Sequence, residues 1–460
     1  MISSIEHKQP RAAYVLFAVQ MWECFSFYGM RALLVLYMVN ELSQGLGHAF
    51  AVYGLYTALV EMGGLAGGII ADKILGLKRS IYLGSVMILL GHSMLFVESS
   101  LYGGLACICV GSSLFKGNIR ALLGALYTKE DPRREKGFTL FYAGSNIGGF
   151  LSTILCGILS IKYGWHVGLG LAALGMLIGL CILFTQQSVI QEEVKKSPSL
   201  KQYLLLTAGL ALSCCGITLS FICPQIAGIL VLVIGCSTTL YFGKQVKSFA
   251  IEKKALVPLL GLLTLLAFYF TFDELMGGML MVFSEEFVER KFFGITLPSS
   301  SLIAINPLIV VLAGFYLSRK DHFFERLGST LKLILAFGLL LTAFSLLYIS
   351  SVVGTDKVCI FFPMVSFCCI ALGELCIVPV VFCYCSKISQ DLFRGRIMSL
   401  VTMSFAYASY GAGELSQRLS IETLAEYKSF FLYSCLAIGA VVACLMTAYT
   451  YRTKKWRPVM

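Results

Sequence analysis

The sequence has 460 residues, of which 58% are hydrophobic and only 13% charged, with a mean hydropathy of +0.83 and a formal net charge of +11. Globular domains carry about 25% charged residues. The composition therefore excludes a soluble domain and indicates a polytopic membrane protein. Its expected partner is the lipid bilayer. The excess positive charge falls mostly in loops between apolar stretches, so it does not indicate a nucleic-acid partner.

Apolar stretches long enough to cross a bilayer recur along the whole chain. A helix needs roughly 20 apolar residues to span a hydrocarbon core of about 30 Å. The sequence predicts fourteen such spans. They cover residues 12–39, 50–71, 80–98, 101–128, 138–161, 164–186, 203–222, 225–243, 256–284, 299–318, 328–351, 357–385, 395–417 and 428–451. A count of thirteen is the alternative, and it would put the termini on opposite sides.

The distribution of lysine and arginine decides between these counts. Basic residues precede the first span and then occur in every second loop, whereas loops such as NELSQGLGH and VESS are poor in them. By the positive-inside rule, both termini are cytoplasmic and the number of spans is even. The polar start MISSIEHKQPR predicts no cleavable signal peptide, since the apolar run after it is long enough to remain as a span.

Motifs for enzyme chemistry do not occur in the sequence. Seventeen cysteines are present, but pairs such as Cys214/Cys215 and Cys368/Cys369 lie within apolar spans, where cysteine acts as a small hydrophobe. No cysteine has metal-ligand spacing with histidine, and no nucleophile or nucleotide motif is found. We expect no enzyme activity, no metal and no bound cofactor.

Charged residues inside the apolar spans are the feature that needs an explanation. They are Glu23, Arg31, Glu61, Lys116, Arg120, Asp273, Glu274 and Glu374. A charge at mid-bilayer costs roughly 3 kcal/mol on insertion scales, and such residues usually face the interior of a helix bundle. Each could be one half of a structural ion pair. A group of eight in one chain instead favours a polar pathway through the bundle.

Six segments carry a resemblance to a known family. They are GGIIADKILGLKRS (67–80), GSSLFKGNI (111–119), GFTLFYAGSNIGGF (137–150), GWHVGLGLAALGM (164–176), PSSSLIAINPL (298–308) and GELCIVPV (373–380). With this order and spacing, the sequence resembles the proton-dependent oligopeptide transporters of the major facilitator superfamily over nearly its whole length. The resemblance implies an all-α fold of two six-helix bundles that rock around a central site. It places the N-terminal bundle at 1–187, a linker with an extra transmembrane hairpin at 188–254, and the C-terminal bundle at 255–460.

The resemblance also shows where the first bundle departs from its family. Members usually carry Glu-x-x-Glu-Arg in the first span, where this chain has Gln20, Glu23 and Cys24. A carboxylate and a guanidinium are thereby lost. One of each returns as Glu61, where relatives have tyrosine, and as Arg120, where relatives have small residues. We expect a neutral proton-coupling network of Glu23, Glu61, Lys116 and Arg120, with Asp273 as a further proton-coupling residue. The alternative is that Glu61 only replaces a hydrogen-bonding tyrosine.

Substrate contacts follow from the same resemblance, because a zwitterionic peptide needs a positive and a negative side. Arg31 and Lys116 would supply the positive side, and Glu374 matches the family glutamate that holds the peptide amine. Asn146 and Asn306 match asparagines that hydrogen-bond the peptide backbone, although Asn306 could instead serve a helix kink beside Pro307. The remaining predicted substrate contacts are the first-span aromatics Phe27 and Tyr28, and Glu274. Asp273 or Glu274 is expected to pair with Arg31 across the bundles and to close the outer side.

The resemblance implies import of di- and tripeptides with protons by alternating access. The alternative is uncoupled uniport or exchange of another small zwitterionic or anionic metabolite, which the missing first-span charges favour. A third hypothesis is a transporter-like sensor without flux, in which the intramembrane charges would be dispensable. We expect the proton as coupling ion, a monomer, and residence in the bacterial inner membrane.

Overall fold

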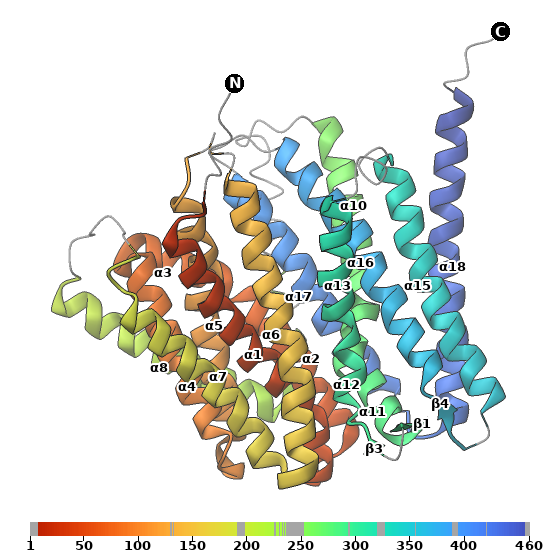
Figure 1. Cartoon of the computed structure of the whole chain (residues 1–460), viewed down its shortest axis with the longest axis horizontal. Helices are drawn as coiled ribbons and strands as arrows, with labels where there is room; N and C mark the ends of the chain where they lie inside the picture. The colour runs from red at the N-terminus through yellow and green to blue at the C-terminus, as the bar shows by residue number, and fades with distance from the viewer. Residues whose placement is uncertain are drawn as a thin grey trace. The chain divides into compact units, whose positions relative to one another are not determined.

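The structure is a computed structural model and is almost entirely helical (Figure 1). It describes residues 8–128, 131, 133–190, 198–224, 227–229, 231, 233, 235, 253–292, 295–319, 327–354, 356–388, 394–419 and 421–455. The chain divides into two compact units. The first contains residues 1–44 and 55–229, and the second contains residues 45–54 and 230–460.

The helices of the first unit are drawn from red to yellow-green in Figure 1, and most of them follow one another along the chain with only a few residues between them. They are α1 (Arg11–Asn40), α2 (Leu46–Met62), α3 (Gly64–Ile70), the π-helix η1 (Ala71–Leu75), α4 (Leu77–Met94), the short η2 (Glu98–Ser100), α5 (Leu101–Ala125), α6 (Arg133–Tyr163), α7 (Trp165–Thr185) and α8 (Leu200–Ile222). Gly45 and residues 46–54 of α2 group with the second unit. The helix α8, the first half of the expected hairpin, packs against α5.

The second unit combines long helices with four two-residue strands. Its helices are α10 (Lys253–Glu274), η4 (Leu275–Gly277), α11 (Met279–Glu286), α12 (Ser300–Ile303), α13 (Ile305–Arg319), α15 (Ser329–Val353), α16 (Phe361–Ile388), α17 (Arg394–Leu419) and α18 (Leu424–Lys455). The strands β1 (Val288–Glu289) and β4 (Val358–Cys359) pair in parallel, and β2 (Lys291–Phe292) pairs antiparallel with β3 (Ile295–Thr296). These short ladders join loops between the helices.

Within the described residues, nine helices are long and apolar enough to cross a membrane. The helix α1 falls outside this group although it has 30 residues, and it contains Glu23 and Arg31. The predicted spans correspond to described helices, except 225–243, most of which lies outside the described residues. Three predicted spans are divided. Residues 50–71 fall into α2, α3 and the start of η1. Residues 256–284 break into α10, η4 and α11, and residues 299–318 break into α12 and α13.

Glycines set the packing between helices of the first unit. A Cβ at Gly148 of α6 would lie 2.1 Å from the carbonyl oxygen of Met21 in α1, and one at Gly144 would lie 2.8 Å from the Phe17 ring. Gly84 of α4 and Gly111 of α5 face each other in the same way. Helices in lipid gain little from the hydrophobic effect, so small residues that let backbones approach closely stabilise their packing. The GSNIGG segment therefore brings α6 onto the charged helix α1.

The core of the second unit is aromatic instead. Phe283 of α11 is fully buried and packs against Tyr427 and Phe431 of α18, with ring centroids 5.0 and 5.2 Å apart. Phe272 of α10 packs edge-on against Phe344 of α15 at 5.1 Å. Edge-to-face aromatic pairs stabilise a core beyond the area that they bury.

Candidate functional site

A charged pair links α2 and α5 inside the first unit. Nζ of Lys116 lies 3.5 Å from Oε1 of Glu61. The side chains are 13% and 27% exposed, respectively. A buried ammonium requires an opposite charge or strong hydrogen bonds, because burial removes its hydration. The pair can therefore keep a lysine charged inside the bundle while its carboxylate stays within reach of solvent.

An aromatic layer from α1 covers this pair. Nζ of Lys116 lies 3.8 Å from the centre of the Phe27 ring, a distance at which the ring face attracts a cation. Phe27 stacks against Tyr56 and contacts the edge of Tyr28. Arg31 lies over the Tyr28 ring at 5.8 Å. Two cations and the predicted aromatic contacts thus form one continuous group in the first unit.

Glu23 is 1% exposed and is held by neutral neighbours. The amide of Gln20 donates to its Oε2 at 3.4 Å and the thiol of Cys24 donates at 3.5 Å. Its Oε1 has no hydrogen-bond partner among the described residues. Lys116 acts on Glu23 electrostatically without a direct contact. The residues that replace the family's lost charges therefore hydrogen-bond the carboxylate that remains.

Arg120 does not join the predicted network directly. It is exposed at the end of α5, and within the described ranges it forms no ion pair. Its charge still acts on Glu23 at a distance. The structure thus brings together Glu61 and Lys116, keeps Glu23 within their field, and places Arg120 at an exposed position. Four-residue spacing put Lys116 and Arg120 on one helical face, but it could not predict how far each lies from solvent.

Asn146 lies in the glycine segment of α6 beside α1. Its side-chain amide donates to the Tyr142 carbonyl at 3.0 Å, and the side chain is partly buried. Gly149, one turn further on, lies against the Tyr28 ring. Asn146 therefore lies close to the aromatic layer. Its hydrogen bond to Tyr142 uses the side-chain nitrogen and not the side-chain oxygen.

Carboxylates form the corresponding group in the second unit. Asp273 and Glu274 end α10, and the side chain of Asn306 in α13 donates to Oδ1 of Asp273 at 3.4 Å. Glu374 of α16 and Asp273 both act electrostatically on Tyr269. The buried Tyr269 hydroxyl donates to the Ile370 carbonyl at 2.6 Å and so ties α10 to α16. The pairing predicted between Arg31 and one of these acids joins the two units and stays a prediction.

Comparison with known proteins identifies the family. The family model described as "PTR2: POT family" matches residues 78–430. The chain belongs to the POT family. It is similar to "Uncharacterized transporter YclF" of Bacillus subtilis, with 30% identity over 89% of this chain and 88% of the relative. It is also similar to "Dipeptide and tripeptide permease A" of Proteus mirabilis, with 29% identity over 95% of this chain and 94% of the relative.

A solved structure supports the fold of this POT chain. A crystal structure of a mutant of "peptide transporter POT" in complex with alafosfalin matches with a TM-score of 0.81 and 27% identity, and covers 96% of this chain and 95% of the other. The predicted family and the all-α major facilitator fold are therefore confirmed, and the protein is an integral membrane protein. The division at 187 and 254 and the roles of the predicted site residues stay predictions.

Two groups of side chains in this POT chain escaped the sequence reasoning. In α17, Arg418 pairs with Glu414 at 2.6 Å, and Glu414 also accepts from the Tyr410 hydroxyl at 3.2 Å. The four-residue spacing of Glu414 and Arg418 could have indicated this pair. The second group joins Glu41, Glu98 and His166. Its members come from distant segments, so no spacing rule could find it.

Proposed function

We propose that this POT protein imports di- and tripeptides together with protons by alternating access. The observation that carries the proposal is the ion pair of Glu61 and Lys116 under the aromatic layer of α1. Charged residues inside a membrane bundle are costly, and those that occur usually mark a substrate or proton pathway. The names of the permease and of the peptide transporter similar to this chain support the same substrate class.

The charges of the two units suit the two ends of a peptide. Arg31 and Lys116 would bind the carboxylate end, because cations and bidentate donors bind carboxylates strongly. Glu374, Asp273 and Glu274 would attract the ammonium end. Asn146 and Asn306 would hydrogen-bond the peptide backbone, for which Asn306 would exchange its bond to Asp273. The peptide would then be bound by its two charged ends. Its side chains would contact the aromatic residues, which can accept side chains of different shapes.

Proton coupling would run through Glu61. When Glu61 is protonated it no longer neutralises Lys116, and the freed ammonium then favours an incoming carboxylate. Release of the proton restores the pair and displaces the substrate. A ligand shifts the equilibrium between two states of a transporter only if it binds them with different affinities. The exchange of partners at Lys116 would give the peptide different affinities for the protonated and deprotonated states.

The experiment that tests this function is uptake of a labelled dipeptide by the purified protein in liposomes, with and without an inward proton gradient. Accumulation above the outside concentration only with the gradient supports a peptide symporter. Absence of any dipeptide flux contradicts the substrate class. Empty liposomes and an unlabelled dipeptide competitor control for leakage and for non-specific binding.

One observation favours a second candidate, uncoupled transport or exchange of another small zwitterionic or anionic metabolite. Gln20 and Cys24, which are neutral, surround Glu23 where the family usually has two further charges. If these lost charges are essential for coupling, the dipeptide equilibrates equally with and without the gradient. The same liposome experiment therefore separates the two candidates.

Location and assembly complete the proposal. The basic loops favour both termini in the cytoplasm, and the bacterial relatives favour the inner membrane. A monomer suffices, since each chain supplies both units. The protein would carry out no covalent chemistry.

A further inference from the structure

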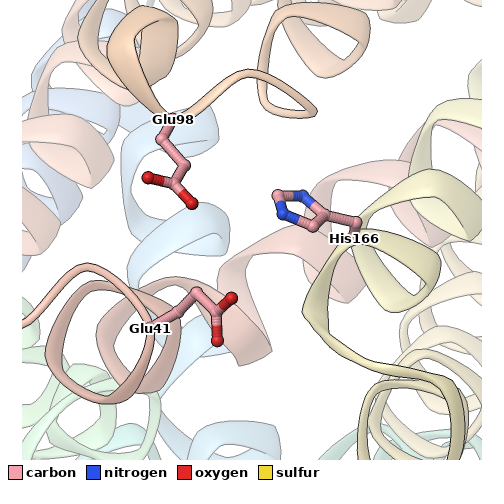
Figure 2. Close-up of side chains that lie close together, drawn as sticks. All are labelled: Glu41, Glu98 and His166. Atoms are coloured by element: carbon pink, nitrogen blue, oxygen red, sulfur yellow. The ribbon is translucent and has the colours of Figure 1, made fainter.

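Three side chains from distant segments converge in the first unit. Glu41 follows the last residue of α1, Glu98 opens η2, and His166 is the second residue of α7. Figure 2 shows the two carboxylates and the imidazole turned toward one common space. One possible ligand atom from each lies within 4.8 Å of the others. The group will be called the EEH cluster.

The EEH cluster brings negative charges together. Glu41 and Glu98 are both exposed at the surface of the unit. Across the part of the chain that the structure describes, neither carboxylate forms an ion pair. Two carboxylates at this distance repel one another. A cation between the three side chains would remove that repulsion.

Two buried polar atoms beside the cluster are unused. Nδ1 of His166 is buried and has no hydrogen-bond partner in the described ranges, and the same holds for the hydroxyl of Tyr37. Tyr37 is 1% exposed, its ring meets the His166 ring edge-on at 6.1 Å, and its hydroxyl lies in the electrostatic field of Glu98 and Glu41. Buried polar groups are nearly always satisfied in native proteins, so each such atom needs an explanation.

We propose that the EEH cluster binds a divalent transition metal of the Zn²⁺ class. One imidazole nitrogen and two carboxylate oxygens are a ligand set that suits Zn²⁺ better than the all-oxygen sites of Mg²⁺ or Ca²⁺. Tetrahedral coordination at the usual bond lengths would bring the donor atoms to about 3.3 Å from one another, a small contraction that rotation of two exposed glutamates supplies. Water takes the fourth position and can also bond the Tyr37 hydroxyl.

The metal would join the ends of three helical segments. Its ligands lie after α1, before α5 and at the start of α7, and α1 also carries Glu23, Phe27 and Arg31. Binding therefore stabilises the first unit at one end of the helix that carries predicted site residues. This inference is independent of the proposed transport function, because it requires no particular substrate or coupling ion.

The test is a titration of the purified full-length protein with Zn²⁺, followed by calorimetry and by thermal unfolding. We expect one saturable equivalent, with Tm raised by roughly 5 °C at a hundredfold excess over Kd. His166→Ala should remove this equivalent and the Tm shift. The double substitution of Glu41→Gln and Glu98→Gln, two exposed positions, should do the same. Glu289→Gln, an exposed glutamate outside the cluster, should leave both unchanged.

Binding of Zn²⁺ to cysteine thiolates elsewhere in the chain must be distinguished from binding to the EEH cluster. Co²⁺ serves as a second probe, because thiolate ligands give it intense charge-transfer absorption and nitrogen and oxygen ligands do not. A saturable Co²⁺ equivalent without that absorption, lost in His166→Ala, supports the EEH cluster. The proposal is overturned if the wild type binds no stoichiometric Zn²⁺, if the glutamine double variant binds it as tightly as the wild type, or if Mg²⁺ binds equally well.

Discussion

The two units hold their intramembrane charges in different ways. In the first unit, Lys116 is paired with Glu61 and capped by an aromatic ring. In the second unit the predicted site residues are all acids or amides, and Asp273 accepts a hydrogen bond from Asn306. The first unit can exchange the partner of a cation, whereas the second can only gain or lose partners for its carboxylates. This difference suggests that proton coupling belongs to the first unit and ammonium recognition to the second.

The packing between helices also differs between the two units. Glycines bring backbones of the first unit into contact, as at Gly148 against Met21, whereas large aromatic rings such as Phe283 fill the second. Backbone contact leaves little freedom for the helices that carry the charged pair. We therefore expect a change in the helix spacing of the first unit to disturb the charged pair directly.

The largest effect is expected for Lys116→Ala, which removes the cation that pairs with Glu61 and weakens the positive field around Glu23. Breaking a buried pair costs about 3–5 kcal/mol, and partial exposure of Glu61 reduces this figure. Dipeptide uptake should still fall by at least about tenfold, equivalent to 1.4 kcal/mol. Initial uptake rates measure this, with Lys162→Ala at an exposed position as control. Uptake near the wild-type rate would remove Lys116 from the site.

A second prediction concerns the glycine contact. In Gly148→Ala the added Cβ would collide with the Met21 carbonyl, so α1 and α6 must move apart. Overpacking of this kind costs about 1–3 kcal/mol. Thermal unfolding of the detergent-solubilised protein should show a lower Tm. Gly439→Ala in α18, where no atom lies within 4 Å of the added Cβ, should leave Tm unchanged or raise it.

Asn306→Ala tests the second unit, where the neutral amide of Asn306 donates a hydrogen bond to the Asp273 carboxylate. A hydrogen bond to a charged group contributes about 1.5–3 kcal/mol at good geometry, and the 3.4 Å separation indicates a weaker bond. We expect KM for a dipeptide to rise by about threefold to tenfold, with a smaller change in the maximal rate. Asn306→Asp, which places a second acid beside Asp273, should raise KM more than the alanine does. An unchanged KM in both variants would place Asn306 outside the site.

The smallest effect is expected at Arg120. It was predicted as part of the network from its spacing to Lys116, but it is exposed and makes no ion pair in the described ranges. Exposed charges usually contribute less than about 1 kcal/mol. Arg120→Ala should therefore change initial uptake by less than about threefold. A loss comparable with that of Lys116→Ala would mean that Arg120 pairs with Glu23 in another state of the transport cycle.

The sequence predicted the fold class well because membrane spans follow from composition alone. Apolar length set the helices, and the ordered motifs around Lys116, Asn146 and Glu374 identified the family. The breaks after Glu274 and before Ile305 were missed, since hydropathy does not report local helix geometry. The EEH cluster was missed for a different reason. Glu41, Glu98 and His166 lie at the ends of three helical segments that are far apart in the sequence, and only the folded chain brings them together.

The central claim is that Glu61 couples protons to transport through Lys116. It is tested most directly in Glu61→Gln by comparing gradient-driven accumulation of a labelled dipeptide with counterflow exchange, which needs no net proton movement. Glu289→Gln serves as the matched control. The account predicts that Glu61→Gln loses accumulation and keeps exchange. Accumulation driven by the proton gradient at the wild-type level in Glu61→Gln would contradict it.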